Sequence, residues 1–300
     1  MGLTEVTTHR RRDDPLISVL MAVRDGRSYL DDSLNSVLDQ TESDLEFLVL
    51  DDGSEDGTLQ RLREFARRDE RVRIWYRSGG GHGGLTRSLN ELLFRSRGQF
   101  IARMDADDVC LPDRFEQQLR FLGRHPTCVL AGGLIEHINR HGDSVACRPL
   151  PLDHDAIDGR HLWQSGGGII HPTWFGRRGL FERLGGYRPQ FPYAQDYDFM
   201  LRAAEVGELR NLKRVVLRYR IHDAQVSRGR RAEQLRCMGR ALRDAGRRRH
   251  ISAELRRRVR RYFLHAAVVA CRGDQYRIAA GAAFQWMFSP LPVFTPRGNT

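Results

Sequence analysis

The chain has 300 residues, of which 40% are hydrophobic and 29% are charged, and its mean hydropathy is −0.52. This length allows one large domain or two small ones with a substantial core, and the hydrophobic fraction excludes a fully disordered chain. The formal net charge is +11, and residues 228–261 account for all of it, because they hold fourteen Arg against three acidic residues. The basic excess is therefore confined to one C-terminal segment.

The N-terminus and the cysteines favour a cytoplasmic protein. No apolar stretch follows the basic residues near the start, so we expect no signal peptide. The five cysteines are scattered and form no Cys-x-x-Cys pair, which indicates reduced thiols and no zinc site.

The first hundred residues alternate between apolar runs of strand length and segments with helical spacing. We expect strands at 16–23, 45–50, 72–76 and 100–104, and helices at 29–38, 59–66 and 85–94. Because three strand–helix units follow one another and the strands are continuously apolar, the pattern predicts an α/β domain. Its central sheet should be mainly parallel, with helices on both faces.

Beyond Pro112 this alternation is lost. We expect a helix at 113–122, one or two strands at 128–138, an irregular stretch at 141–175, a helix at 197–206 and a strand near 214–221. The segment 229–272 is typical of one or two strongly basic helices. Residues 278–296 are uncharged but contain three prolines, so we expect them to pack on the protein or lie in a membrane interface without spanning it.

Clustered carboxylates follow two of the expected strands, at the end of a parallel sheet where ligands usually bind. Asp51 and Asp52 open the sequence DDGSEDG, which also fits a turn in which Ser54 or Asp56 caps a helix. Asp105 and Asp107 are alternate carboxylates, and such a pair can bind one Mg²⁺ or Mn²⁺ together with water and phosphate oxygens. The second motif predicts a divalent-cation site, whereas the first stays open between ligand binding and a turn.

A competing motif lies between the third expected strand and the third expected helix. Residues Gly79–Gly84 read GGGHGG and match the G-x-G-x-x-G fingerprint of dinucleotide binding. Five glycines in six residues match this pattern almost by default, and two strand–helix units precede it. An NAD(P)-dependent oxidoreductase that uses this loop is the alternative function.

A third acidic motif, QDYD, contains Asp196 and Asp198 at the start of a helix. Asp196 could cap this helix, with Asp198 in the first turn facing the helix dipole. The motif could equally supply a general base. The residues alone do not separate these interpretations.

Nine segments follow one another in an order typical of one family. They read PLISVLMAV, DQT, LEFLVLDDGSEDGT, LTRSLN, GQFIARMDADDVCLPDRFEQQLRFL, HPTWFGRR, GGY, QDYDFMLRAAEVG and LRYRIHDAQVS. Together they resemble bacterial family 2 glycosyltransferases, which are inverting enzymes with a GT-A-type fold. The resemblance covers residues 15–228.

The resemblance implies a domain organisation. Residues 1–14 would be an N-terminal tail, and residues 15–226 a GT-A-type nucleotide-diphospho-sugar transferase domain. Within this domain, 15–112 would form the nucleotide-sugar-binding half and 113–226 the acceptor half. Residues 227–300 would be an Arg-rich helical extension outside the resemblance.

The resemblance also implies residues that bind the donor. Asp51 matches the residue that contacts the nucleotide base or ribose, and Ala22 and Val23 would line the same pocket. Arg87 matches a position near the donor diphosphate. Arg24-Asp25 stands where the family usually has Tyr-Asn, so Asp25 bears on the choice among UDP-, dTDP- and GDP-sugar donors.

Metal and catalytic residues follow in the same way. Asp105, which would also contact the donor, and Asp107 match the acids that bind Mn²⁺ or Mg²⁺, with Asp107 as the more direct ligand. His222 matches a residue that reaches the metal or the diphosphate, and a buried hydrogen-bonded histidine is the open alternative. Asp196 matches the acid that deprotonates the acceptor hydroxyl, although Gln195 stands where the family usually has Glu.

These residues imply a single displacement that inverts the anomeric centre. The metal and Arg87 would stabilise the charge that builds on the leaving diphosphate, while Asp196 takes the hydroxyl proton. The resemblance implies a saccharide or lipid-linked acceptor and a role in the synthesis of cell-surface polysaccharide or glycolipid.

The basic segment 228–261 suggests two further partners. Arg-rich amphipathic helices bind anionic lipid headgroups, which would place the protein at the inner face of the membrane as a peripheral protein. They also bind nucleic acid, and a non-catalytic nucleic-acid-binding protein is the third hypothesis. We do not expect nucleic acid as the partner. Only the transferase hypothesis requires Asp107.

Overall fold

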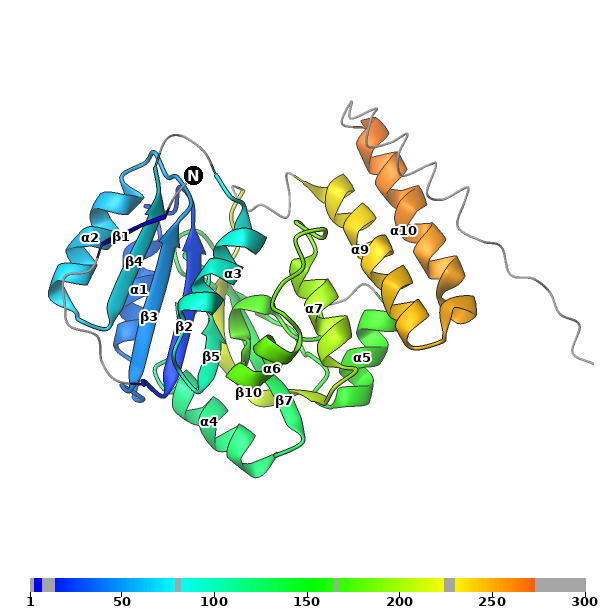
Figure 1. Ribbon diagram of the computed structural model, residues 1–300, viewed down its shortest axis with the longest axis horizontal. Coiled ribbons are helices and arrows are strands. Elements are labelled where there is room, and N and C mark those ends of the chain that lie inside the picture. The colour runs from blue at the N-terminus through cyan, green and yellow to red at the C-terminus, as the bar shows by residue number, and fades with distance from the viewer. Residues whose placement is uncertain (1–2, 7–13, 79–81, 165–166, 224–229, 273–300) are drawn as a thin grey trace, which may run out of the picture.

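Four parallel strands form the centre of the sheet in the computed structural model (Figure 1), which describes residues 3–6, 14–78, 82–164, 167–223 and 230–272. They lie in the order β4 (Val72–Arg77), β3 (Leu45–Asp51), β2 (Ile17–Val23) and β5 (Phe100–Arg103). Every residue of β3 and all but one of β2 are buried, which explains why their sequences are apolar apart from Ser18, Glu46 and Asp51. The predicted parallel sheet is confirmed.

Helices cover both faces of this sheet. One face packs against α1 (Leu30–Leu38), α2 (Thr58–Arg68) and α4 (Arg114–Arg124). The other face packs against α3 (Leu85–Arg95), α6 (Arg178–Arg183) and α7 (Gln195–Ala203). Successive strand residues supply opposite faces, so that Val19 belongs to the first core and Leu20 to the second.

The second half of the chain extends the sheet beyond β5. β9 (Phe175–Arg177) pairs antiparallel with both β5 and β7 (Cys128–Ile138), and β7 pairs parallel with β10 (Glu208–Arg220). The short β6 (Val109–Cys110) pairs antiparallel with β10, and β8 (Ser144–Cys147) pairs with β7. The β6–β10 pairing brings the loop after β5 next to the end of β10.

Several of these elements differ from the sequence prediction. The segment 128–138 is one strand, as one of the two alternatives had it, whereas α7 begins at Gln195 and β10 begins at Glu208, both earlier than expected. The stretch expected to be irregular contains β8 and the helix α5 (His154–Trp163). Asp153 caps α5 by accepting a hydrogen bond from the Ala156 amide at 2.9 Å.

The N-terminal residues also contribute to the sheet. Leu3–Val6 forms β1, which pairs antiparallel with β4 at the sheet edge. The segment expected to be a tail therefore contains an edge strand.

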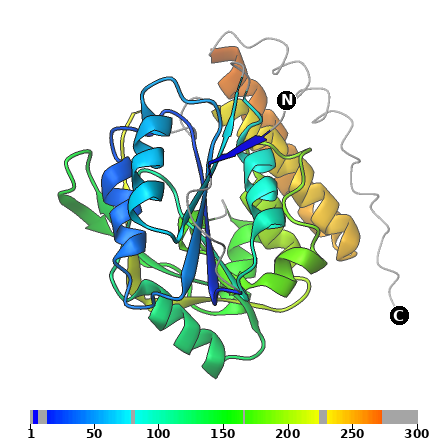
Figure 2. The same cartoon turned by 60° about the vertical axis from the view of Figure 1, so that its left-hand side comes forward.

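The basic C-terminal segment forms a helical hairpin of α9 (Arg231–Arg248) and α10 (Ser252–Arg272), which lies beside α7 and α5 (Figures 1 and 2). One buried cluster combines side chains of the hairpin, such as Leu242 and Phe263, with Tyr197 and Leu201 of α7. The hairpin thus shares a core with α7. Within the described residues no helix is both long and apolar enough to cross a bilayer; the segment 278–296 lies outside them.

Candidate active site

The loops that follow β2 and β3 are held together at the carboxyl edge of the sheet. Val23 pairs with Asp51 across the two strands. Asp25 adopts a left-handed φ of 52° and accepts a hydrogen bond from the Glu55 amide at 2.9 Å, while its own amide donates to Ser54 Oγ at 2.9 Å. Asp25 therefore shapes the loop that would face the nucleotide.

Asp51 is buried at the start of the second loop and forms its turn. Its Oδ1 accepts hydrogen bonds from the amides of Gly53 at 2.9 Å and Ser54 at 2.8 Å. Its Oδ2 is buried without a partner among the described residues. Burial raises the pKa of this carboxyl group. The turn interpretation is thus correct, and the unpaired oxygen leaves Asp51 an acceptor for a ligand hydroxyl.

The expected helix cap after this turn is only partly found. Gly57 is the N-cap of α2 and no side chain caps the helix there. Asp56 instead accepts hydrogen bonds from the amide and the hydroxyl of Thr58, at 3.0 and 2.6 Å. Ser54 is used to hold the neighbouring loop.

The other expected donor-binding residues lie around these loops. Ala22 is half-buried and packs against the core that contains α3, whereas Val23 is buried in the core on the opposite face. Only the backbone of Val23 can face the donor. Arg87 is exposed in the first turn of α3 and forms no ion pair with any residue that the structure describes.

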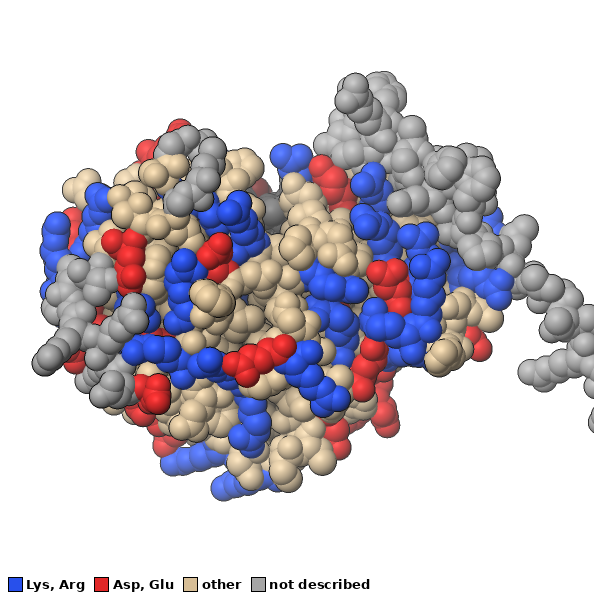
Figure 3. Space-filling model, in the orientation of Figure 1, with Lys and Arg blue, Asp and Glu red and all other residues tan. Residues whose placement is uncertain are grey.

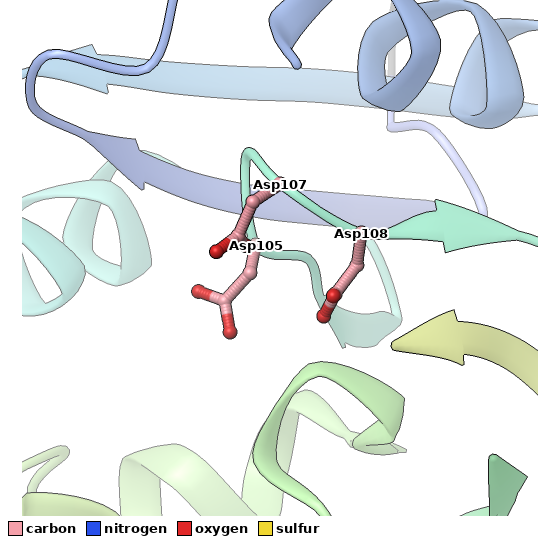
Figure 4. Close-up of side chains that lie close together, drawn as sticks. All are labelled: Asp105, Asp107 and Asp108. Atoms are coloured by element: carbon pink, nitrogen blue, oxygen red, sulfur yellow. The ribbon is translucent and has the colours of Figure 1, made fainter. Parts of the chain in front are cut away.

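Three carboxylates gather in the loop between β5 and β6 (Figure 4). One oxygen each of Asp105, Asp107 and Asp108 lies within 4.8 Å of the others. The cluster arises because the strand ends at Arg103, the chain turns through this loop, and β6 then pairs with β10. Asp105 and Asp107 were expected here from the sequence, and the structure brings them together.

Each carboxylate in the loop has a different partner. Asp105 forms an ion pair with Arg103, and Asp107 Oδ2 lies 2.9 Å from His222 Nε2. Asp108 is buried and accepts a hydrogen bond from the Arg220 amide at 2.9 Å, but its Oδ2 has no partner among the described residues. The structure therefore brings His222 to the acidic loop, which fits both interpretations of this residue, a histidine near the metal and a hydrogen-bonded histidine.

The electrostatics of the loop favour a cation. Burial and the charge of Asp105 raise the pKa of Asp107, with His222 opposing the shift. Burial and the charges of Asp107 and Asp105 raise the pKa of Asp108 well above its usual value. Oxygen ligands are those that Mg²⁺ and Mn²⁺ prefer, and a cation would relieve this repulsion and use the unpaired oxygen of Asp108. The residues present thus fit a divalent cation.

Asp196, the third candidate acid, is influenced by the charge of the acidic loop. It lies near the start of α7, and its Oδ1 accepts a hydrogen bond from the Tyr197 amide at 2.8 Å. Burial raises its pKa, and the charge of Asp105 raises it further while that of Arg103 lowers it. Because Ala194 is the N-cap of α7, Asp196 is not the capping residue that one interpretation expected.

Asp198, the other acid of this motif, is fully buried. Arg188 and Arg202 both donate through Nε to its Oδ2, at 3.0 and 2.9 Å. Two arginines therefore occupy this carboxylate, which leaves Asp196 as the candidate base.

Comparison with known proteins decides among the three hypotheses. The sequence model of the family described as "Glycosyl transferase family 2" matches residues 18–185. The chain is 32% identical over 212 residues to the O-antigen biosynthesis glycosyltransferase WbnJ of Escherichia coli. The match covers 69% of this chain and 80% of that protein. The chain belongs to glycosyltransferase family 2.

Solved structures agree with this assignment at the level of the fold. Residues 1–349 of S. aureus TarS, in complex with UDP-GlcNAc, superpose with a TM-score of 0.62 at 15% identity, over 90% of this chain and 91% of that one. The mannosyltransferase PcManGT of Pyrobaculum calidifontis, in complex with GDP-Man and Mn²⁺, superposes with a TM-score of 0.61 at 16% identity, over 92% and 88%. The family 2 glycosyltransferase described here therefore has the expected GT-A-type fold.

The oxidoreductase alternative finds no support in these comparisons or in the glycine loop. Gly79–Gly81 lie outside the described residues. The amides of Gly83 and Gly84, which would face a pyrophosphate in a dinucleotide site, donate to the Asp52 carboxylate at 2.9 and 2.8 Å. The protein's own carboxylate thus occupies the N-terminus of α3.

Three site residues of this glycosyltransferase were not predicted from the sequence. Asp52 pairs with the buried Arg77 at 2.6 Å and fixes the end of the glycine loop. Arg220 donates through Nε to the Asp107 carbonyl at 2.8 Å and through Nη2 to Asp32 at 3.1 Å. Arg103 binds Asp105. Each stands within or beside a motif that was recognised. The partners of Asp52 and Arg220 are distant in sequence, whereas Arg103 pairs with Asp105 two residues further on.

Proposed function

We propose that this family 2 glycosyltransferase transfers a sugar from a nucleoside-diphosphate sugar to an acceptor hydroxyl, with inversion, at the carboxyl edge of β2, β3 and β5. The observation that carries the proposal is the cluster of Asp105, Asp107 and Asp108 in the loop after β5, with His222 beside Asp107. Asp105 and Asp107 come from the loop after β5, whereas Asp196 comes from α7, and the charge of Asp105 acts on Asp196. A metal-bound diphosphate and an acceptor hydroxyl could be held between them.

The donor nucleotide would bind across the ends of β2 and β3. Asp51 offers an unpaired, buried oxygen to the base or ribose, and Ala22 and the backbone of Val23 would line the pocket. Asp25 would set the loop beside the base, and Arg87, at the N-terminal turn of α3, would approach the diphosphate. UDP-, dTDP- and GDP-sugars are the candidate donors.

The divalent cation would be held by Asp105 and Asp107, with His222 beside Asp107. When bound, Mn²⁺ or Mg²⁺ supplies positive charge to the leaving diphosphate. His222 Nε2 lies within hydrogen-bond distance of Asp107, so it orients this carboxylate and could itself reach the ion. The complex of PcManGT with GDP-Man and Mn²⁺ supports manganese as the first ion to test.

Asp196 would accept the proton of the attacking hydroxyl. Its buried position raises its pKa, which makes the carboxylate a stronger base. Asp198, held by two arginines below it, would stabilise the N-terminal turn of α7 that presents the base.

The acceptor would be a saccharide or a lipid-linked saccharide. A relative at 32% identity is named for O-antigen biosynthesis, which supports a cell-surface glycan as the product. Arginines gather around α9 on the face shown in Figure 3. This basic surface would place the enzyme on an anionic membrane beside a lipid-linked acceptor.

Calorimetric titration tests the proposed chemistry. UDP, dTDP, GDP and NAD⁺ are each added to the full chain with and without Mn²⁺. We expect one nucleoside diphosphate to bind in a metal-dependent manner, and Asp107→Ala to weaken it by at least about 10–100-fold. Asp143→Ala, which removes an exposed carboxylate outside the cluster, should bind as the wild type does. Binding of NAD⁺ alone, without a metal effect, would overturn the proposal.

A further inference from the structure

Arg103 is a buried cation at the centre of the proposed site. It is the last residue of β5 and only 2% exposed. Because strand residues alternate, its side chain shares the face of Ile101, whose core also contains Trp174 and Tyr187. The charge of Arg103 acts on His171 as well, whose pKa lies well below its usual value through burial and this cation. An arginine in such apolar and aromatic surroundings is costly unless it is paired.

The partners of Arg103 are few. Nη2 binds Asp105, and Nη1 donates to the Leu20 carbonyl at a long 3.4 Å. Nε is buried without a partner among the described residues. Within the described chain, Asp105 is the one carboxylate that pairs with this guanidinium.

The charge of Arg103 extends to the other acids. It lowers the pKa of Asp196 and of Asp108, against the larger effect of burial on both. Arg103 thus pairs with Asp105, and its charge also acts on Asp108 and Asp196. Without it, the site would be strongly negative; such a site attracts a bare divalent cation and repels an anionic diphosphate.

We propose that Arg103 is a positioning residue that balances the charge of the acidic loop, so that the divalent cation binds together with the nucleoside diphosphate instead of tightly on its own. The proposal rests on the metal-dependent donor binding proposed above. Through Asp105, Arg103 holds one carboxylate oxygen and leaves the other for the ion. Its positive charge offsets the negative charge of Asp105, which reduces the repulsion of the anionic diphosphate when the diphosphate binds.

The test compares Mn²⁺ binding and nucleotide binding in the full chain. Mn²⁺ alone is titrated into wild type, Arg103→Met and Arg103→Lys, with bound Mn²⁺ followed by water-proton relaxation. Binding of UDP, GDP and dTDP at saturating Mn²⁺ is measured by calorimetry. We expect Arg103→Met to bind Mn²⁺ alone several-fold more tightly and the nucleoside diphosphate about tenfold more weakly. Arg103→Lys, which restores the charge, should return both values toward wild type.

Arg114→Met is the matched control. Arg114 is fully buried and donates to the Arg103 carbonyl at 2.9 Å and to Gln118 at 3.1 Å, without an ion pair among the described residues. Loss of Arg114 should lower the melting temperature. It should not move the affinity for Mn²⁺ and the affinity for the nucleoside diphosphate in opposite directions.

The outcomes separate the two proposals. If Arg103→Met weakens Mn²⁺ and nucleotide binding together, or changes neither, the role of Arg103 is overturned while the proposed function stands. If the wild type binds no nucleoside diphosphate with Mn²⁺, the proposed function fails and the role of Arg103 fails with it.

Discussion

Asp196 is the residue on which the proposed proton transfer depends. Its environment differs from that of Asp198, only two positions away, because Asp198 is neutralised by two arginines and Asp196 is not. We expect Asp196→Asn to lower kcat by about 10²–10⁴-fold and to leave nucleoside diphosphate binding nearly unchanged. The rate is measured as nucleoside diphosphate release, with the nucleotide sugar that the calorimetry selects and a saccharide acceptor. A variant that retains more than a tenth of the rate would exclude Asp196 as the base.

The same residue predicts a pH dependence. A base acts when it is deprotonated, so the rate should fall as the pH falls through its pKa. Burial and the charge of Asp105 raise this pKa in the folded protein. The acid limb of kcat should therefore lie above the value near 3.9 that is usual for Asp. This acid limb should be absent from the pH profile of the residual rate of Asp196→Asn. A limb that persists in that variant would belong to another titrating group.

At the scale of single elements, the strands and the acidic motifs were more predictable than the residues that support them. β2 and β3 are buried on both faces, so their sequences are apolar apart from Ser18, Glu46 and Asp51. Asp105 and Asp107 stand at a strand end, where ligands bind. Arg220 could not be assigned from sequence because its contacts with Asp107 and Asp32 exist only after β10 folds beside β6. α5 was missed because it lacks a clear apolar stripe, although Asp153 was a capping signal.

The helix α7 makes an element-scale prediction about stability. Asp198 is fully buried, and its partners Arg188 and Arg202 have side chains that are 27% and 9% exposed. Asp198→Asn removes the negative charge and leaves two arginines without it, so the free energy of unfolding should fall by about 3–5 kcal/mol. Urea unfolding measures the change.

Glu182→Gln is the control for this experiment. It disrupts the Arg178–Glu182 pair one helical turn apart on α6, whose side chains are 37% and 59% exposed. Exposed pairs contribute at most about 1 kcal/mol, so this variant should unfold nearly as the wild type does. Similar losses in both variants would show that Asp198 does not support α7 through its buried charge.

At the scale of the whole molecule, the basic hairpin is part of the enzyme fold. Its composition predicted helices. Its contact with α7 and α5 could not be derived, because each helix is rich in arginine and has only a narrow apolar face. That face supplies Leu242 and Phe263 to a core shared with Leu201 of α7. Ion pairs add to the contact, since Arg249 binds Asp158 of α5 at 2.6 Å. The orientation of the opposite, exposed face of α10 is thereby fixed relative to the active site.

That exposed face predicts how the enzyme meets a membrane. Arg257 and Arg261 are exposed one turn apart on α10, and Leu264 and Val268 continue the same face at 49% and 42% exposure. Basic and apolar side chains in this order suit an anionic bilayer surface. Each basic residue near such a surface contributes about 1 kcal/mol. We therefore expect Arg257→Glu/Arg261→Glu to weaken binding to vesicles containing phosphatidylglycerol at least about tenfold, as measured by flotation.

The charge of α10, and not a general positive charge, should determine this binding. Arg67→Glu/Arg68→Glu makes the same change of net charge on α2, where both side chains are exposed. This control should bind the vesicles nearly as the wild type does. High salt should weaken vesicle binding by the control and by the wild type alike, because it screens the electrostatic interaction. Both variants should keep the wild-type melting temperature, since the reversed residues lie outside the core. Equal losses in the two variants, or full binding by the α10 variant, would contradict attachment through α10.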